Sequence, residues 1–417
     1  MVVGSSIPRT DLELLTSGKA LFIDDINLPG MTYGAVLRSA VAHARILRLD
    51  ISRALRMPGV VAGVTAADFR DNRYGPTHKD QPVLADCKVR HVGEGLAAIA
   101  AETPELAEEA LSKIQVELEE LPPVLDPVEA MEPGSPKVHD GGNVAYTTTL
   151  EKGNVQAGFQ ISEIIVEDSF RTQMVEHCHL EPHGAVAQML DDGSLRVWTS
   201  IQRPFIIAND IARVLGMPLN RVSVSVLRVG GGFGGKNEIT VEPIAAALAI
   251  KCGRPVKVTF SRHDEMVAST VRHAYVIRIR TGLGKRGELL AREVNIVSDA
   301  GGYVSWGART LDKACVCAAG PYEIPNIKVT GILVYTTKNV GGAMRGFGVP
   351  QVCFAHEVHT DHICRTIGVD PLEFRKENCV RTGSTTVTSQ RLEVVTLPTV
   401  LDRLEEMIRS GGRPSEH

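Results

Sequence analysis

Apolar and polar residues alternate along the first third of the chain in short runs, which predict a mixture of strands and helices. Strands are predicted at residues 33–38, 44–49, 60–64, 95–101 and 115–120. A helix is predicted over 104–114, where the apolar spacing becomes helical and a glutamate lies in the first turn. This mixed pattern is typical of a compact α+β unit.

A proline-rich segment separates this unit from a second one. Five prolines lie between Leu121 and Pro136, and this density predicts a linker. Beyond it, strands are predicted at 164–170, 187–189, 195–199, 222–229, 256–260, 274–281 and 292–298, and helices at 206–215, 243–250, 351–366, 371–377 and 396–408. We therefore expect an α+β protein. Its predicted parts are a first domain (1–127), a linker (128–142), a second domain (143–380) and a tail with a short helix (381–417).

Composition excludes several classes of protein. Of the 417 residues, 43% are hydrophobic and 23% charged, so a large core is available. With 45 basic and 49 acidic residues the formal net charge is −4, which gives no electrostatic case for binding nucleic acid. No run of about 18 apolar residues occurs, and the N-terminus has no secretory pattern. We expect a cytoplasmic protein with no membrane segment.

The eight cysteines are scattered along the chain without a CxxC pair. A disulfide framework is not expected in a long chain without a secretory signal. An iron–sulfur cluster needs four grouped thiolates, which this spacing does not provide. The pattern predicts buried, reduced thiols.

The most prominent motif is the glycine-rich run Gly230–Lys236, which lies between a predicted strand and a predicted helix. Its glycines allow close approach of the backbone to a ligand, and a following helix N-terminus favours an anion. The run fits the GxxxxGK pattern, but Asn237 follows where a P-loop needs Ser or Thr for Mg²⁺. It also fits the dinucleotide fingerprint, although deep inside the chain. A nucleotide-binding protein built on this run is the alternative hypothesis.

A second glycine-rich run, Gly341–Gly348, surrounds Arg345 with small residues. A guanidinium can donate two hydrogen bonds to an oxo group, a phosphate or a carboxylate. Two such runs in one chain suggest that a single polar ligand is held from two sides.

The segment from His177 to His183 resembles a metal site in composition, because it contains three histidines, a cysteine and a glutamate. In an extended strand, His177, His179 and Glu181 would face one side and Cys178 the other. No second ligand cluster is obvious for a closed tetrahedral site. The favoured interpretation is a set of hydrogen-bonded residues beneath a ligand site, and a zinc-binding subunit is the alternative.

Several ordered motifs together resemble the large, molybdopterin-binding subunit of the xanthine dehydrogenase and aldehyde oxidase family of molybdenum hydroxylases. The motifs are VGGGFGGK (229–236), GAMRGFGVPQ (342–351), GPYEIPNI (320–327), EHCHLEPH (176–183) and TSIQ (199–202). Upstream, GKALFIDDI, AHARILRLDIS and VGEGLAAIAAETPELAEEA resemble that family's N-terminal hammerhead domain. The resemblance covers roughly residues 15–408. It implies a hammerhead domain followed by a mixed α/β molybdopterin-binding domain.

The resemblance also implies positions for the cofactor. Gln202 is similar to the glutamine that hydrogen-bonds a molybdenum oxo ligand, and Gly232, Phe233 and Gly234 match the backbone beside the metal's apical oxygen. Arg345 matches an arginine next to the cofactor. Gln202 and Phe233 would thus lie near molybdenum, with no direct protein ligand to the metal. Neutral amide donors of this kind stabilise charge that develops on oxygen.

Three residues are implied for the substrate pocket. Phe347 matches a phenylalanine that stacks on the substrate ring, while Asn237 and Lys313 stand where xanthine-oxidising members carry a glutamate and an arginine. These two departures argue against the usual mode of binding xanthine. An ammonium group suits a carboxylate as well as a carbonyl. We expect an N-heteroaromatic substrate that is hydroxylated with oxygen from water, with nicotinate ahead of purines, as in the bacterial nicotinate dehydrogenases, whose molybdenum subunit is split in two.

The same resemblance implies several partners. Family large subunits continue through a second half that carries the catalytic glutamate base, so no catalytic residue is assigned to this chain. A polar end after a short helix favours a split subunit over a random break. We expect a second molybdopterin-binding subunit, separate [2Fe–2S] and FAD subunits, and the cytosine dinucleotide form of the cofactor.

Overall fold

Strand β1 (Thr32–Arg38) pairs with strands from distant parts of the chain. It runs antiparallel to β7 (Gly95–Ala101) and parallel to β14 (Val256–Thr259).

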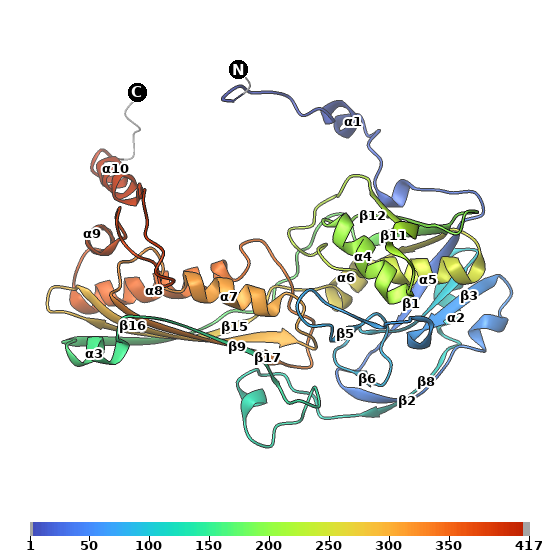
Figure 1. Cartoon of the computed structure of the whole chain (residues 1–417), viewed down its shortest axis with the longest axis horizontal. Coiled ribbons are helices and arrows are strands. Elements are labelled where there is room, and N and C mark those ends of the chain that lie inside the picture. The colour runs from blue at the N-terminus through green and yellow to red at the C-terminus, as the bar shows by residue number, and fades with distance from the viewer. Residues whose placement is uncertain (1–2, 412–417) are drawn as a thin grey trace. The chain divides into compact units, whose positions relative to one another are not determined.

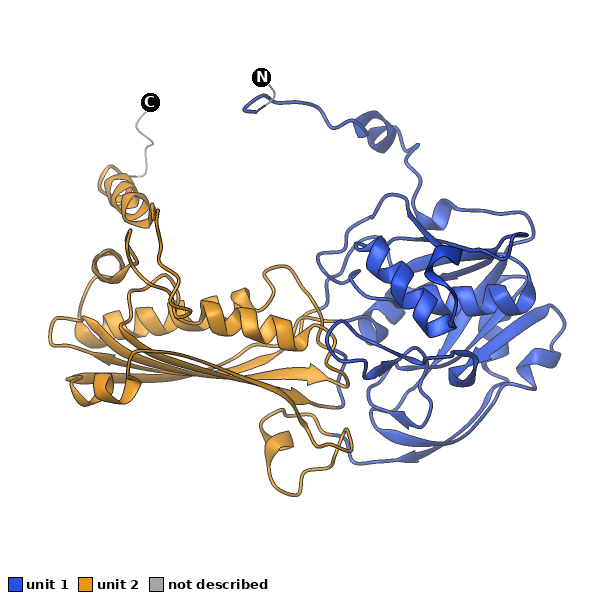
Figure 2. Cartoon of the chain, in the orientation of Figure 1, with its two compact units in different colours: residues 1–123, 176–270, 337–340 blue, residues 124–175, 271–336, 341–417 orange. Residues whose placement is uncertain are grey.

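The computed structural model describes residues 3–411 and contains two compact units (Figure 2). Unit 1 comprises residues 1–123, 176–270 and 337–340, and unit 2 comprises 124–175, 271–336 and 341–417. The domain boundaries inferred from the sequence stay a prediction, and residues 412–417 of the predicted tail lie outside the described part.

Unit 1 is built on a seven-stranded sheet in the order β13-β12-β11-β14-β1-β7-β3 (Figure 1). Its remaining strands are β3 (Val60–Thr65), β11 (Gly184–Met189), β12 (Leu195–Thr199) and β13 (Val222–Val226). A second sheet has the order β6-β2-β8, from β6 (Lys88–Val89), β2 (Ala44–Asp50) and β8 (Gln115–Glu120), and β4 (Arg73–Tyr74) pairs with β5 (Gln81–Pro82). The helices are α1 (Leu12–Thr16), α2 (Pro104–Leu111), α4 (Pro204–Leu215), α5 (Glu242–Cys252) and α6 (Arg262–Ala268), with short 3₁₀ turns at 23–25, 54–56, 66–68 and 219–221.

Alternation along β7 explains how helices cover both faces of this sheet. Ala98 and Ala100 pack in the cluster formed with α4 and α5, whereas Ile99 and Ala101 pack in clusters that include α2. Helix α5 is buried over most of its length because its sequence is apolar all round. Helix α2 begins at Pro104, and the Thr103 hydroxyl accepts a hydrogen bond from the backbone N–H of Leu106.

Unit 2 is a five-stranded sheet in the order β10-β15-β16-β17-β9, with α7 and α8 on one face and the short α3 on the other (Figure 1). Its strands are β9 (Val144–Lys152), β10 (Ile164–Arg171), β15 (Tyr275–Leu283), β16 (Leu289–Gly301) and β17 (Asn326–Tyr335). Its helices are α3 (Val155–Gln160), α7 (Gly307–Cys317), α8 (Val349–Ile367), α9 (Pro371–Asn378) and α10 (Leu397–Arg409), with a 3₁₀ turn at 129–131. Ala130 and Val138 of the predicted linker (128–142) are buried in the core of this unit, together with Val124 just before it.

The expected α+β class is confirmed, and the differences in detail have physical reasons. Strand β13 ends at Val226 instead of residue 229, because the backbone turns there into the glycine-rich run. The sequence analysis did not predict β9, β17, α3 or α7. All eight cysteines are free thiols, but the expectation that they are buried is wrong for most of them, since the buried ones are Cys315, Cys364 and Cys379. No helix within residues 3–411 is long and apolar enough to cross a bilayer.

A directed chain of hydrogen bonds runs through the core of unit 2. The Arg292 guanidinium donates to the Thr281 hydroxyl over 3.0 Å, and that hydroxyl donates to His359 Nε2 over 2.8 Å. His359 Nδ1–H then donates to an Asp168 carboxylate oxygen over 2.5 Å. Arg292 and His359 are fully buried, so each depends on these partners. The chain fixes a neutral His359 with its proton on Nδ1.

This neutral histidine predicts that the stability of unit 2 falls in acid. Burial, with the nearby positive charge of Arg292, lowers the pKa of His359 to about 4, although the Asp168 hydrogen bond opposes the shift. The unfolded chain takes up that proton near pH ~6.5, so stability is full above that pH and falls towards pH 4 by up to about 1.4 kcal/mol per pH unit. We expect His359→Gln to flatten this dependence in thermal unfolding measured between pH 4 and 6.5.

His362→Gln is the matched control for this prediction. His362 lies on the same helix and binds the same carboxylate at 2.9 Å, but its side chain is exposed. An unchanged slope in His359→Gln, or an equal change in the control, would contradict the assignment.

Candidate functional site

The first glycine-rich run forms the turn between β13 and α5. Helix α5 begins only at Glu242, and the Glu242 carboxylate already accepts hydrogen bonds from Thr240 N–H and the Thr199 hydroxyl, both over 2.7 Å. The run therefore does not open the helix as a P-loop or a dinucleotide fingerprint does. The first turn of this helix already carries the Glu242 carboxylate, and an anion bound at its N-terminus stays a prediction.

Lys236 gives a second argument against nucleotide binding. Its side chain is fully buried, and its ammonium group donates to Glu181 over 2.9 Å. Burial lowers the pKa of Lys236, against the stabilising effect of Glu181. A P-loop lysine instead extends towards the phosphates of its ligand. The structure thus contradicts the alternative of a nucleotide site on Gly230–Lys236.

The glycines of this run are required by what lies beneath them. A β-carbon at positions 230, 231, 232 or 235 would lie 2.5–3.0 Å from a neighbouring side chain. Those neighbours are, in the same order, Glu181, His179, Gln202 and His177. Three of the four belong to the predicted histidine-rich segment, so that segment is the support on which the glycine-rich run rests.

Gln202 is held by its carbonyl end. Its Oε1 accepts backbone hydrogen bonds from Gly234 over 3.1 Å and Lys236 over 3.3 Å, and its own backbone N–H donates to the Lys236 carbonyl over 2.8 Å. Backbone N–H groups only donate, so this arrangement assigns Oε1 to the loop and leaves the NH₂ group without a partner within residues 3–411. An exposed neutral donor is thereby fixed beside the glycine-rich run.

Each glycine-rich run holds a phenylalanine in the left-handed region. Phe233 has φ +53° and Phe347 has φ +52°. Bulky residues seldom adopt this conformation, and such strain clusters at functional sites. The backbone N–H groups of Gly232 and Phe233 have no hydrogen-bond partner within residues 3–411, and Phe233 is exposed while Gly232 is buried.

The histidine-rich segment is irregular instead of an extended strand, since Cys178 has φ +51°. His179, His183 and Glu265 lie in unit 1 with potential metal-ligating atoms within 4.8 Å of one another. Most of these atoms are engaged. His183 Nδ1 lies 2.9 Å from the Glu265 carboxylate, and His179 Nδ1 donates to the Glu181 carbonyl over 2.7 Å. These contacts agree with the favoured interpretation of a hydrogen-bonded support.

The second glycine-rich run lies against α7 in unit 2. A β-carbon on Gly348 would lie 2.4 Å from the Thr310 carbonyl oxygen and 3.1 Å from Ala314. Phe347 packs edge-on against Trp306, with ring centroids 6.1 Å apart. Lys313 is exposed on the same helix, between the two α7 residues that contact Gly348. The structure therefore brings together the second run and the helix that carries Lys313.

Arg345 is exposed at the tip of this second run. Its backbone carbonyl accepts from the Arg272 guanidinium over 2.7 Å, and Arg272 also donates to Gln351 over 3.3 Å. The Arg345 guanidinium itself has no hydrogen-bond partner within residues 3–411, so a fixed backbone presents an available cation.

The predicted site residues fall into two groups. Unit 1 holds Gln202, Gly232, Phe233, Gly234 and the half-buried Asn237, and unit 2 holds Lys313, Arg345 and Phe347. Convergence of the two groups on one ligand stays a prediction. The sequence analysis missed the roles of Glu181 and Lys236, although a GK pair without the following Ser or Thr was a usable signal.

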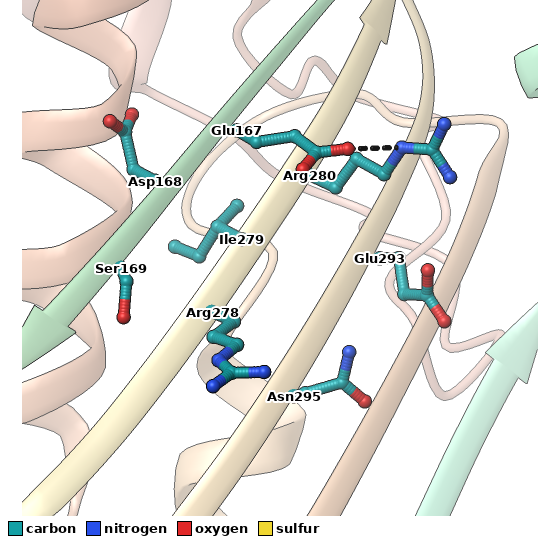
Figure 3. A pocket seen from close by; sticks show the side chains of 8 residues that line it. All are labelled: Glu167, Asp168, Ser169, Arg278, Ile279, Arg280, Glu293 and Asn295. Carbon is teal, nitrogen blue, oxygen red and sulfur yellow. Dashed lines mark ion pairs between the residues drawn. The ribbon is translucent and has the colours of Figure 1, made fainter.

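A polar hollow on unit 2 contains none of these residues. It has a volume of about 490 Å³ and is lined by side chains of β10, β15 and β16 (Figure 3). Glu167 and Arg280 form an ion pair of 2.8 Å across its upper part. The strand registers continue this pair into a ladder of opposite charges across the sheet, namely Glu167, Arg280, Glu293, Lys328 and Glu151. The hollow belongs to an outer sheet face stabilised by cross-strand charge pairs.

Comparison with known proteins supplies two family models. A model described as "Molybdopterin cofactor-binding domain" matches residues 138–379, and one described as "Aldehyde oxidase and xanthine dehydrogenase, a/b hammerhead domain" matches residues 17–122. The predicted order of a hammerhead domain followed by a molybdopterin-binding domain is confirmed.

Relatives of known sequence or structure agree with these models. The chain is 40% identical over 371 residues to a probable xanthine dehydrogenase subunit of Bacillus subtilis, covering 89% of this chain and 50% of that one. It is 37% identical over 396 residues to the nicotinate dehydrogenase large molybdopterin subunit of Eubacterium barkeri, covering 94% and 92%. The aldehyde oxidoreductase of Desulfovibrio gigas superposes with a TM-score of 0.94 at 30% identity, covering 98% of this chain and 46% of that one. The chain thus spans about half of two of these relatives and most of the third.

Proposed function

The chain belongs to the xanthine dehydrogenase and aldehyde oxidase family of molybdenum hydroxylases, and on this basis we propose that it is one of two polypeptides that share a molybdopterin site in an N-heteroaromatic ring hydroxylase. The observation that carries the proposal is the 37% identity to the Eubacterium barkeri nicotinate dehydrogenase large molybdopterin subunit, over 94% of this chain and 92% of that one. The second polypeptide contributes the catalytic glutamate and the remaining contacts to the cofactor.

The residues of unit 1 fit a molybdenum oxo centre. Such a centre is rich in oxygen acceptors, and the site offers neutral N–H donors: the Gln202 amide and the backbone of Gly232 and Phe233. Side chains of the support fill the space beneath the glycine-rich run, so these donors lie on the opposite side of the run. Arg345 of unit 2 supplies a cation to the same cofactor in this proposal.

The chain's own residues bind and orient, while the cofactor supplies the oxygen-transfer and electron-transfer chemistry. Gln202 donates a hydrogen bond to the cofactor through its NH₂ group. This group stays exposed because the side-chain carbonyl is the end that the glycine-rich run holds. Phe347 stacks on the substrate ring and is kept in place by Trp306. When bound, the cofactor would pass its electrons to [2Fe–2S] and FAD groups on separate subunits, and we propose its cytosine dinucleotide form. We place this enzyme in the cytoplasm.

We propose an anionic N-heteroaromatic substrate, with nicotinate ahead of xanthine. Support comes from Lys313 and Asn237, which replace an arginine and a glutamate of xanthine-oxidising members, and from the substrate in the name of the Eubacterium barkeri relative. Lys313 is an exposed cation on the helix that packs against Phe347's loop, so its ammonium group can pair with a carboxylate.

Lys313→Met tests this choice of substrate. We expect the KM for nicotinate to rise by about tenfold while kcat changes little, because the variant loses one ionic contact that is at most half-buried. Arg309→Met is the matched control, because Arg309 is another exposed cation one turn earlier on α7. Steady-state kinetics with nicotinate and xanthine would measure both effects. Unchanged kinetics with nicotinate, or better turnover of xanthine, would contradict the proposal.

The metal content of the native complex tests the proposed function as a whole. Purification from the source cell should give this chain with a second molybdopterin-binding polypeptide, near-stoichiometric molybdenum and released pterin. Expression of this chain alone should give poorly soluble protein without molybdenum, because apolar surface such as Val400, Leu404 and Ile408 on α10 stays exposed. A soluble, molybdenum-loaded and active single chain would refute the shared site.

A further inference from the structure

One carboxylate connects the two ends of the first glycine-rich run. Glu181 Oε2 accepts from the backbone N–H of Gly230 over 2.7 Å and from the Lys236 ammonium over 2.9 Å. In return, the backbone N–H of Glu181 donates to the Gly230 carbonyl over 3.1 Å. The other carboxylate oxygen accepts from the backbone N–H of Ile23 over 3.3 Å. A single side chain thus pins the first and last residues of the run to each other and to the support.

We infer that this clasp, formed by Glu181, Gly230 and Lys236, positions the glycine-rich run and Gln202 for the molybdenum cofactor. The inference rests on the proposed function, because the cofactor contact of the run is part of that proposal. Glu181 and Lys236 are positioning residues, since neither side chain is exposed towards a ligand: Lys236 is 0% and Glu181 11% exposed.

The link from the clasp to Gln202 passes through the backbone of Lys236. That residue's carbonyl accepts from the Gln202 backbone, and its N–H donates to Gln202 Oε1. When the ammonium group of Lys236 is held by Glu181, both of these backbone groups are fixed. A shift of Lys236 would therefore turn the Gln202 amide and release the Gly234 N–H that shares Oε1.

The energetics favour a closed clasp. An ammonium group taken out of water is costly unless it is paired, and removal of one partner leaves an uncompensated buried charge. Gly230 cannot move closer to relieve a lost contact, because its α-carbon already approaches Glu181 so closely that a β-carbon would lie 2.5 Å from the Glu181 β-carbon. Loss of either charged partner should therefore loosen the whole run instead of shifting it to a new stable position.

Glu181→Gln and Lys236→Met, introduced into the full complex, test the clasp. Glu181→Gln keeps the shape and one acceptor but loses the charge, and Lys236→Met keeps most of the volume. We expect hydrogen exchange of the amides in 230–236 to accelerate about tenfold or more in both variants, as for the loss of a charge-assisted hydrogen bond. Molybdenum per polypeptide should fall, and kcat should fall more than KM rises. The double variant should lose no more than the worse single variant, because either change opens the same clasp.

Lys251→Met is the matched control. Lys251 forms a 2.6 Å ion pair with Asp68 in the same unit, outside the glycine-rich run. The Lys251→Met variant should at most lower the melting temperature. The hydrogen exchange rates of residues 230–236 and the molybdenum content should be unchanged. Unaltered exchange in the clasp variants would overturn the inference, and so would faster exchange with full molybdenum and kcat. A wild-type complex without molybdenum would overturn the proposed function instead, while the exchange rates would still decide whether the clasp holds the loop.

Discussion

Replacing Gly234 by valine is expected to abolish turnover and to leave the enzyme without molybdenum. Gly234 has φ +106°, which β-branched side chains essentially never adopt, and its N–H donates to Gln202 Oε1. Valine would force the backbone to a negative φ at a cost of roughly 1–3 kcal/mol or more, and the turn would move away from Gln202. Displacement of about 1 Å at a catalytic site is enough to lower turnover about 100-fold.

Gly193→Val is the control that separates strain from position. Gly193 also has a positive φ, +77°, and lies in the turn between β11 and β12, where a β-carbon would meet no atom within 4 Å. It should lower the melting temperature slightly and keep molybdenum and kcat. Metal analysis and steady-state kinetics on the purified complexes would check both variants. Full turnover and molybdenum in Gly234→Val would show that this run is not the cofactor loop.

Elements with strong local signals were predicted closely from the sequence. Strands β7, β8 and β12 have the predicted bounds, because each is a short apolar or alternating run bounded by turn residues. Helix α4 differs by two residues at its start, where Pro204 occupies the first turn. In these segments the local pattern and the tertiary contacts favour the same structure.

Elements without a sharp boundary signal were missed. Helix α7 has no side-chain cap at Trp306 and contains a glycine, a threonine and two cysteines, although Ala308, Leu311 and Cys315 have helical spacing. Strand β9 is threonine-rich and half exposed, so its alternation is weak. The pairing of β1 with β14 could not be predicted, because no local pattern specifies partners more than 200 residues apart.

The candidate site was predicted in its parts but not in its connections. Resemblance and residue chemistry identified Gln202 and the glycine-rich run, and the structure shows that they hydrogen-bond each other, which the sequence analysis did not predict. The pairing of Glu181 with Lys236 joins residues 55 positions apart, and the sequence analysis assigned Glu181 only to a histidine-rich segment. A buried lysine and a ligand-binding lysine look alike in a sequence, and only burial distinguishes them.

The second glycine-rich run should be as sensitive as the first, at Gly348. Its φ is +87°, and a β-carbon there would lie 2.4 Å from the Thr310 carbonyl oxygen. That oxygen belongs to the backbone of α7 and cannot turn aside as a flexible side chain can. Valine at this position therefore combines left-handed strain with overpacking, and we expect a loss of roughly 2–5 kcal/mol of unfolding free energy.

Gly383→Val isolates the strain in that prediction. Gly383 has φ +98°, but the nearest atom to its β-carbon position is the end of the Arg391 side chain at 4.0 Å. The difference in melting temperature between the two variants, measured on the assembled complex, therefore reports the contact between the second run and α7. Because Phe347 packs on Trp306 beside this contact, Gly348→Val should also change tryptophan fluorescence and lower kcat, whereas Gly383→Val should do neither. Equal melting temperatures with unchanged fluorescence would mean that the run does not rest on α7, and the positions of Phe347 and Lys313 in the proposed substrate pocket would then lose their structural support.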